Sequence, residues 1–224
     1  MRGLSVHRGF GMYRKFEIQK NDVVSIVGSG GKTTLMFKLG RELKKMGKVL
    51  ITTSTKIGIP TELEDDEICV ENFDGNFNGI NLVITGGEST DKKITSADYD
   101  YLKEILSKFD YVLIEADGSK QKPYKASREN EPVIYDITTK TIAVLPMMKY
   151  LNELNKDDIF NFKLFKDRFG RVVLDDSLIL KMLSHREGIF KNSVGEKYLY
   201  LNRVEEDISK LEEEIGKLDI KLRR

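Results

Sequence analysis

Short apolar runs alternate with longer amphipathic stretches along most of the chain. The apolar runs are Val23–Val27, Val49–Ile51, Leu82–Ile84, Tyr111–Ile114, Thr141–Leu145 and Tyr198–Leu201. Runs of this length read as buried strands, and the helical stretches between them favour crossover connections between parallel strands. The pattern therefore predicts an α/β fold, a three-layer α/β/α sandwich around a mostly parallel sheet.

The amphipathic stretches indicate the helices. A leucine at every fourth position predicts a helix from about 33 to 46, and another is expected from about 97 to 108. A C-terminal helix is predicted over 205–222. Its apolar positions are spaced by three and four residues: Ile208, Leu211, Ile215, Leu218 and Leu222. The pattern lasts only about two heptads, so packing on the protein's own sheet is favoured over a coiled coil.

The organisation expected is one domain over residues 1–224. The weakly patterned stretch 60–81 is read as an insertion or long loop, with a small strand at 68–70. Apolar residues make up 40% of the chain and charged residues 33%, which is ordinary for a soluble globular protein. A chain of 224 residues is long enough to bury a sizeable core.

Charge and residue content exclude several classes of function. The formal net charge is +1, which gives no electrostatic case for binding nucleic acid or an anionic membrane. Apolar stretches are shorter than the roughly 20 residues that span a bilayer, and residues 1–15 are too polar for a signal peptide, so a cytoplasmic protein is expected. One cysteine and two histidines make a zinc site of the usual type improbable.

A glycine-rich turn links the first strand to the first long helix. It reads Gly28-Ser29-Gly30-Gly31-Lys32-Thr33-Thr34. Phosphates bind where backbone N–H groups converge at a helix N-terminus, and side chains would obstruct that approach. Lys32 is placed to reach the β- and γ-phosphates, and Thr33 offers a hydroxyl to Mg²⁺. The longer P-loop pattern has a further glycine where this chain has Ile26, so the turn is a shortened variant that predicts binding of ATP or GTP.

A carboxylate ends the fourth apolar run, and a second one follows. We expect Glu115 to hold Mg²⁺ together with Thr33, and Asp117 to orient or deprotonate a water molecule. Lys32, Glu115 and Asp117 are therefore the candidate catalytic residues. The segment 119–128 that follows is basic and lies where ligands of open α/β folds collect. It could grip an anionic substrate or be a solvated loop.

The last apolar run leads into Asn202-Arg203-Val204-Glu205, which reads N-R-x-E. GTPases carry N-K-x-D at this place, so Asn202 and Glu205 are candidates for binding the nucleotide base. An equally good reading makes Glu205 to Asp207 the acidic first turn of the last helix.

These segments together resemble the YqeC family, whose members are described as accessory proteins of selenium-dependent molybdenum hydroxylases. The resemblance rests on VVSIVGSGGKTTLMFKLGREL, VLITTSTKI, YVLIEADGSKQKPYKA with ENEPVI, HREGIFKN and LNRVEE. It implies a P-loop NTPase-like sandwich and a role in maturing a selenium-containing molybdenum cofactor. It also implies that Lys120, Lys122 and Lys125 contact substrate. Arg203 and Glu205 depart from the family's pattern. The choice between ATP and GTP as the ligand therefore stays open.

Three functions compete at this stage. The leading hypothesis is a Mg²⁺-dependent NTPase that acts on a selenium- and molybdenum-containing hydroxylase or on its maturation proteins. The second is a kinase or ligase that transfers a phosphoryl group to a small anionic substrate. The third is a nucleotide-gated binding module that does not hydrolyse its ligand.

Overall fold

The computed structural model describes residues 11–90 and 93–224. Its centre is one sheet of eight strands, all parallel to their neighbours. In order across the sheet these are β13 (Lys221–Arg223), β12 (Glu196–Asn202), β10 (Lys140–Pro146), β1 (Val23–Gly28), β8 (Tyr111–Glu115), β2 (Val49–Thr53), β5 (Leu82–Gly86) and β4 (Glu67–Glu71). Residues 1–10, on which most of the argument against a signal peptide rests, lie outside the described part.

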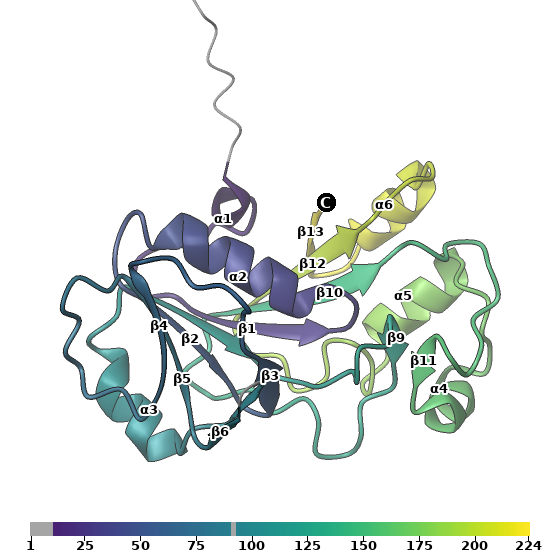
Figure 1. Cartoon of the computed structure of the whole chain (residues 1–224). Helices are drawn as coiled ribbons and strands as arrows, with labels where there is room; N and C mark the ends of the chain where they lie inside the picture. Colours follow the sequence, from purple (N-terminus) through teal and green to yellow (C-terminus); the bar gives the residue numbers. More distant parts are fainter. Residues whose placement is uncertain (1–10, 91–92) are drawn as a thin grey trace, which may run out of the picture.

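Helices cover both faces of this sheet, which confirms the three-layer α/β/α fold (Figure 1). One face carries α1 (Met12–Lys15) and α2 (Lys32–Leu43). The other carries α3 (Tyr99–Leu106), α4 (Phe162–Phe169), α5 (Asp176–Ser184) and α6 (Ser209–Ile215). Among the described helices, none has the length and apolar character needed to cross a bilayer.

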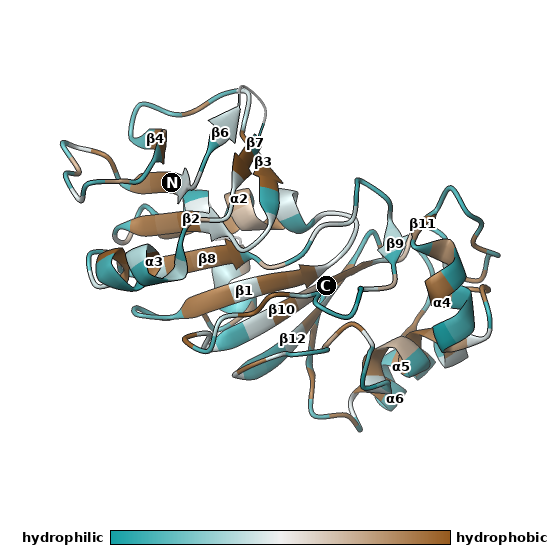
Figure 2. Cartoon of the chain, turned by 90° about the horizontal axis from the view of Figure 1, so that it is seen from below, coloured by the Kyte–Doolittle hydropathy of each residue, from teal (hydrophilic) through white to brown (hydrophobic). Residues whose placement is uncertain are grey.

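The central strands are apolar at consecutive positions because each face of the sheet has its own hydrophobic core. Ile26 packs toward α2, whereas its neighbour Val27 packs toward α4 and α5. On β10, Ile142 likewise packs in the core on the α2 face, and Ala143 packs in the core on the opposite face. Figure 2 shows the resulting row of hydrophobic strands. This two-sided burial explains why continuous apolar runs marked these strands in the sequence.

The predicted elements occur within a few residues of their expected limits, with one clear exception. The small strand expected at 68–70 is β4, at the edge of the sheet. The C-terminal helix predicted over 205–222 is wrong: α6 spans only Ser209–Ile215, and β13 follows it along the edge of β12.

The reason for that error is that two periodicities overlap at the C-terminus. Leu218 and Leu222 continue the helical spacing, but Leu218, Ile220 and Leu222 also alternate as a strand does. All three are partly buried against the core beneath the sheet. Gly216 follows the last helical residue, and glycine is a poor helix former. Pairing with the otherwise open edge of β12 decides in favour of the strand.

Two small sheets complete the structure. One is an antiparallel ribbon of β3 (Lys56–Gly58), β7 (Lys93–Thr95) and β6 (Ser89–Thr90). In the other, β9 (Tyr124–Lys125) pairs with β11 (Ile159–Phe160) and so ties the basic segment to the region before α4.

Candidate functional site

The turn after β1 needs glycine at three positions. Gly28, Gly30 and Gly31 have φ values of +93°, +51° and +119°, which side-chain-bearing residues rarely adopt. A Cβ atom on Gly28 would lie 2.3 Å from the carbonyl oxygen of Val144, on the neighbouring strand. The glycines thus let the turn fold tightly against β10 before α2 begins.

The N-terminus of α2 points its free amides at the space in front of this turn. The helix begins at Lys32, and its N-cap, Gly31, provides no side-chain acceptor. The first N–H groups of a helix have no intrahelical partner, and the helix dipole adds partial positive charge there. These features favour an anionic group, such as a phosphate, at the turn.

Lys32 is folded back onto its own turn. Its ammonium group donates to the carbonyl oxygen of Gly28 at 3.0 Å and lies 3.0 Å from Asp117 Oδ1. Glu115 Oε1 is farther away, at 3.8 Å. The Lys32 side chain is only 4% exposed, so both carboxylates act on it with little screening by water.

Thr33 and Glu115, the two residues expected to hold Mg²⁺, contact each other directly. The hydroxyl of Thr33 donates to Glu115 Oε2 at 2.7 Å. Mg²⁺ binds oxygens at about 2.1 Å in an octahedron, so adjacent ligand oxygens lie about 2.9 Å apart. Thr33 and Glu115 therefore fit a magnesium site. Burial raises the pKa of the Glu115 carboxyl, against the opposing effect of Lys32 and Thr33.

Asp117 lies behind the turn and is almost fully buried. Its Oδ2 accepts a hydrogen bond from the backbone N–H of Gly28 at 3.0 Å and pairs with the Lys125 ammonium at 2.5 Å. Lys125 also donates to the carbonyl oxygen of Gly118. Burial lowers the pKa of Lys125, although the attraction of Asp117 acts in the other direction.

A cleft of about 390 Å³ opens in front of the glycine turn. Its walls are residues 30–34 of the turn and α2, residues 118–121 after β8, and the ribbon of β3 and β7. Among the described residues, four lysines line it against one carboxylate, that of Glu115: Lys32, Lys56, Lys93 and Lys120. A cleft with this excess of positive charge favours a ligand that carries several negative charges.

The sequence analysis did not single out Lys56 and Lys93 as site residues. In the ribbon, Lys56 pairs with Thr95 and Gly58 with Lys93, so both lysines lie on one face. The other face carries Ile57 and Ile94, which are buried in the core around α2. Alternating exposed and apolar residues at 56–58 and 93–95 hinted at short strands, but only the pairing of β3 with β7 brings the two lysines together.

The three lysines of the basic segment differ in position. Lys120 lines the cleft, with its ammonium 5.2 Å from the centre of the Phe160 ring. Lys122 donates to the carbonyl oxygens of Lys156 and Ile159, and in the described structure it is not among the residues that line the cleft. Lys125 is held against Asp117, so the segment does not act as one basic surface.

Asn202 and Glu205 differ in their surroundings. Asn202 Nδ2 donates to the carbonyl oxygen of Gly30 at 3.3 Å, which braces the glycine turn. The side chain of Glu205 is exposed, and α6 begins only at Ser209. Asp207 accepts hydrogen bonds from the backbone and hydroxyl of Ser209, so the acidic residues precede the helix rather than forming its first turn.

Fold and site together define a parallel α/β protein with a glycine-rich turn between a central strand, β1, and the helix α2. The family model described as YqeC protein matches residues 24–163, and the chain belongs to that family. It is 29% identical over 180 residues to a protein of Escherichia coli (strain K12) named "Uncharacterized protein YqeC", covering 76% of this chain and 70% of that protein. No solved structure matches the chain significantly.

Proposed function

We propose that this protein binds a nucleoside triphosphate with Mg²⁺ and hydrolyses it. The observation that carries the proposal is the juxtaposition of the glycine turn, the free amides of α2 and the Thr33–Glu115 contact at 2.7 Å. Phosphoryl transfer is catalysed mainly by positioning and by stabilisation of negative charge, and these groups supply both.

In this proposal each residue has a separate task. Thr33 and Glu115 would hold Mg²⁺, which neutralises charge on the phosphate oxygens when bound. Lys32 leaves Asp117 and the Gly28 carbonyl to contact the phosphates. Lys56 and Lys93 approach from the ribbon and stabilise further negative charge. Asp117 keeps its contacts with Gly28 and Lys125 and holds the turn in shape.

The cellular role that we propose follows from the family. On the resemblance to accessory proteins of selenium-dependent molybdenum hydroxylases, we place this protein among the factors that mature such an enzyme or its cofactor. Its partner would be the hydroxylase or another maturation protein. Copurification with a tagged hydroxylase, with and without Mg²⁺ and nucleotide, tests this role.

A second candidate function is phosphoryl transfer to a small acceptor rather than to water. It is favoured by Lys56, Lys93 and Lys120, which line the cleft outside the glycine turn and would attract an anionic acceptor. Turnover that requires an added small molecule would support transfer, whereas release of inorganic phosphate by the protein alone would support hydrolysis. Tight Mg²⁺–nucleotide binding with no product over hours would favour a non-hydrolysing binding module.

The test of nucleotide binding is calorimetric titration of ATP and GTP, each with and without Mg²⁺. We expect micromolar binding of one of them by the wild type and at least a tenfold loss in Lys32→Ala, because the contact between lysine and phosphate is charge-assisted. Lys38→Ala is the matched control, since Lys38 is an exposed lysine farther along the same helix. Absence of binding by folded wild type would refute the proposal.

A further inference from the structure

The carboxylate of Asp117 is shared by two buried lysines. Its Oδ1 lies 3.0 Å from the Lys32 ammonium, and its Oδ2 lies 2.5 Å from the Lys125 ammonium. The side chains of Asp117, Lys32 and Lys125 are 1%, 4% and 5% exposed, so water screens these contacts little. The two ammonium groups therefore compete strongly for one carboxylate.

The two lysines differ in their freedom to move. Lys32 is the first residue of α2 and lines the cleft, so its ammonium can turn toward a bound phosphate. In the described structure Lys125 is not among the residues that line the cleft, and its ammonium also donates to the carbonyl oxygen of Gly118 at 3.2 Å. A ligand in the cleft can therefore take Lys32 from Asp117, whereas Lys125 stays with it.

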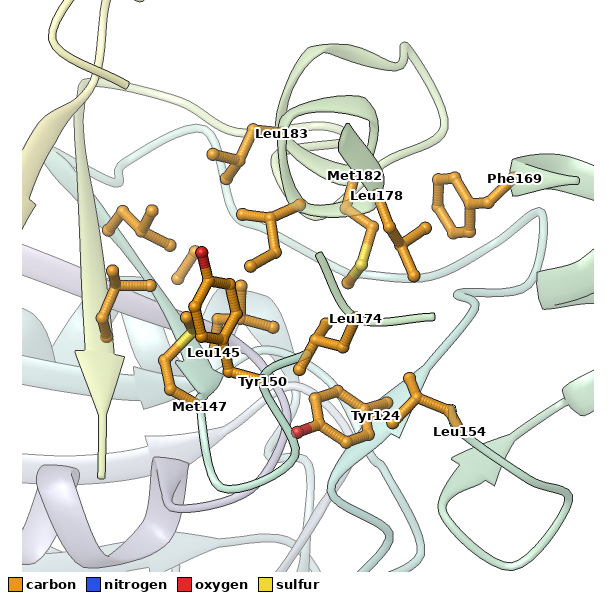
Figure 3. Close-up of a cluster of buried hydrophobic side chains, with 14 of the residues drawn as sticks. Tyr124, Leu145, Met147, Tyr150, Leu154, Phe169, Leu174, Leu178, Met182 and Leu183 are labelled. Atoms are coloured by element: carbon orange, nitrogen blue, oxygen red, sulfur yellow. The ribbon is translucent and has the colours of Figure 1, made fainter. Parts of the chain in front are cut away.

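The short strand β9 fixes the backbone of Lys125. Lys125 pairs with Phe160 of β11, and the residue before it, Tyr124, is fully buried. The Tyr124 hydroxyl donates to the carbonyl oxygen of Pro146 at the end of β10, and Figure 3 shows the Tyr124 ring in the core beneath the sheet. Lys125 is thus anchored to the central sheet, and its ammonium stays on Asp117.

Asp117 also holds the start of the glycine turn. Its Oδ2 accepts the backbone N–H of Gly28 at 3.0 Å, so this amide is not free for a phosphate. The N–H of Ser29 donates to a carbonyl oxygen of β10 at 3.0 Å. The phosphates of a ligand are thus left to the amides of residues 30–34 and to Lys32, so release of Lys32 from its carboxylate matters for binding.

The charge balance around the turn comes to depend on Lys125 once a nucleotide is bound. Two cations, Lys32 and Lys125, face two carboxylates, Glu115 and Asp117. In the proposed complex Glu115 pairs with Mg²⁺ and Lys32 with phosphate, which leaves Asp117 to Lys125 alone. Without Lys125, the nucleotide would take Lys32 only by leaving a buried carboxylate unpaired, which is strongly unfavourable.

We propose that Lys125 is a positioning residue of the nucleotide site. Asp117 competes with the phosphates for Lys32, and Lys125 weakens this competition because it neutralises Asp117 at its other oxygen. The resemblance to the family implied that Lys125 contacts substrate, but in this proposal it acts through Asp117 and Lys32. The sharing of Asp117 stands on the distances given above, whereas its effect on binding rests on the function proposed above.

The test is calorimetric titration of Mg²⁺–ATP and Mg²⁺–GTP into wild type and Lys125→Met. Methionine is also unbranched and removes only the charge and its hydrogen bonds. We expect the affinity for the nucleotide that wild type binds to fall at least about tenfold, because Asp117 then keeps Lys32. Lys166→Met, at an exposed position on α4, is the control and should bind as wild type does. Unchanged affinity in folded Lys125→Met would overturn the proposal.

A variant of Asp117 separates action through this carboxylate from direct contact with the ligand. Asp117→Asn removes the charge that competes for Lys32 and should bind nucleotide at least as tightly as wild type does. Adding Lys125→Met to Asp117→Asn should then change the affinity by less than about threefold. A further loss of about tenfold in the double variant would mean that Lys125 touches the ligand or only shapes the turn, and would refute the proposal. If Lys125→Met alone does not fold, this comparison carries the test, because the double variant leaves no unpaired carboxylate at position 117.

A measurement without nucleotide distinguishes this proposal from the function on which it rests. Because two lysines share one carboxylate, the loss of Lys32 should cost more stability when Lys125 is already absent. Lys32→Met should therefore lower the midpoint of urea denaturation more in the Lys125→Met background than in wild type. Equal shifts would refute the sharing of Asp117. Unequal shifts in a protein that binds neither nucleotide would refute the proposed function and leave the sharing of Asp117 in place.

Discussion

Two buried clusters of charged side chains in this protein behave in opposite ways. The edge cluster, Lys44 with Glu64, Asp66 and Glu67, joins α2 to the segment that enters β4. The turn cluster, Lys32 with Glu115, Asp117 and Lys125, lies around the glycine turn. Both contain lysines and carboxylates that are almost fully buried, so burial alone does not distinguish them.

In the edge cluster each resolved pKa shift favours the charged form. Burial acts against it, but hydrogen bonds from the Lys44 ammonium to three carboxylates raise the pKa of Lys44. Burial likewise opposes ionisation of Glu67, yet hydrogen bonds from Arg41 and Lys44 lower its pKa. The charges of the edge cluster are mutually satisfied, which is typical of an ion pair that serves structure.

In the turn cluster the resolved shifts disfavour the charged form. Burial raises the pKa of Glu115 and lowers that of Lys125. Keeping Glu115 and Lys125 charged therefore costs desolvation free energy, which a bound ion or ligand would offset. Perturbed groups of this kind concentrate at functional sites. The direction of the pKa shifts therefore distinguishes the two clusters and favours the turn cluster as the candidate functional site.

The largest effect is expected when the edge cluster is broken. Lys44→Met leaves Glu67 buried without its closest cation, and should lower the free energy of unfolding by about 3–5 kcal/mol. Urea denaturation measures this change. Lys45→Met, at the exposed neighbouring position, should stay within about 0.5 kcal/mol of wild type. A change below about 1 kcal/mol in Lys44→Met would show that the edge cluster contributes little.

The opposite response is expected from the turn cluster. Glu115→Gln should lower nucleotide hydrolysis on the order of 100-fold, the loss seen when one preorganised electrostatic group is removed. Its free energy of unfolding at neutral pH should be equal to or above that of wild type, because a buried charge is removed. Steady-state kinetics and urea denaturation of Glu115→Gln and of Glu104→Gln, an exposed control on α3, test both statements. Marked destabilisation with full activity would reverse the assignment.

A smaller effect is expected from the lysines of the ribbon. Lys56→Ala and Lys93→Ala should each weaken triphosphate binding by about 1 kcal/mol, or roughly fivefold, because they are exposed charges. The loss should be smaller for the diphosphate and should shrink at high salt. Titrations at two ionic strengths, with Lys38→Ala for comparison, measure it. Equal losses for di- and triphosphate would place the ribbon away from the terminal phosphate.

The smallest effect concerns pH. Folding raises the pKa of the Glu115 carboxyl group, so this group binds its proton more tightly in the folded state. It therefore lowers the free energy of unfolding as the pH rises above its pKa in the unfolded state. The advantage of Glu115→Gln over wild type should therefore be full above the folded pKa of Glu115. This stability advantage should disappear as the pH falls below the pKa of glutamate in the unfolded chain, about 4.3. Denaturation at several pH values tests this, and an advantage that grows toward acid would contradict it.

The sequence determined by itself those features that depend on residues close together in the chain. The strand, the glycine turn and the helix from Val23 to Leu43 could be predicted because apolar periodicity and three nearby glycines act locally. Glu115 could be predicted as well, since the apolar run before it placed it at the end of a strand.

Tertiary structure alone decided how distant segments meet. The sequence placed Leu218 and Leu222 on a helix, but the open edge of β12 made that segment a strand. Lys56 and Lys93 became neighbours only through the pairing of β3 with β7, and Asn202 reached the Gly30 carbonyl only because β12 lies beside β10 in the sheet. Such contacts depend on packing and on strand pairing between residues far apart in the sequence. Local sequence patterns cannot predict either of them.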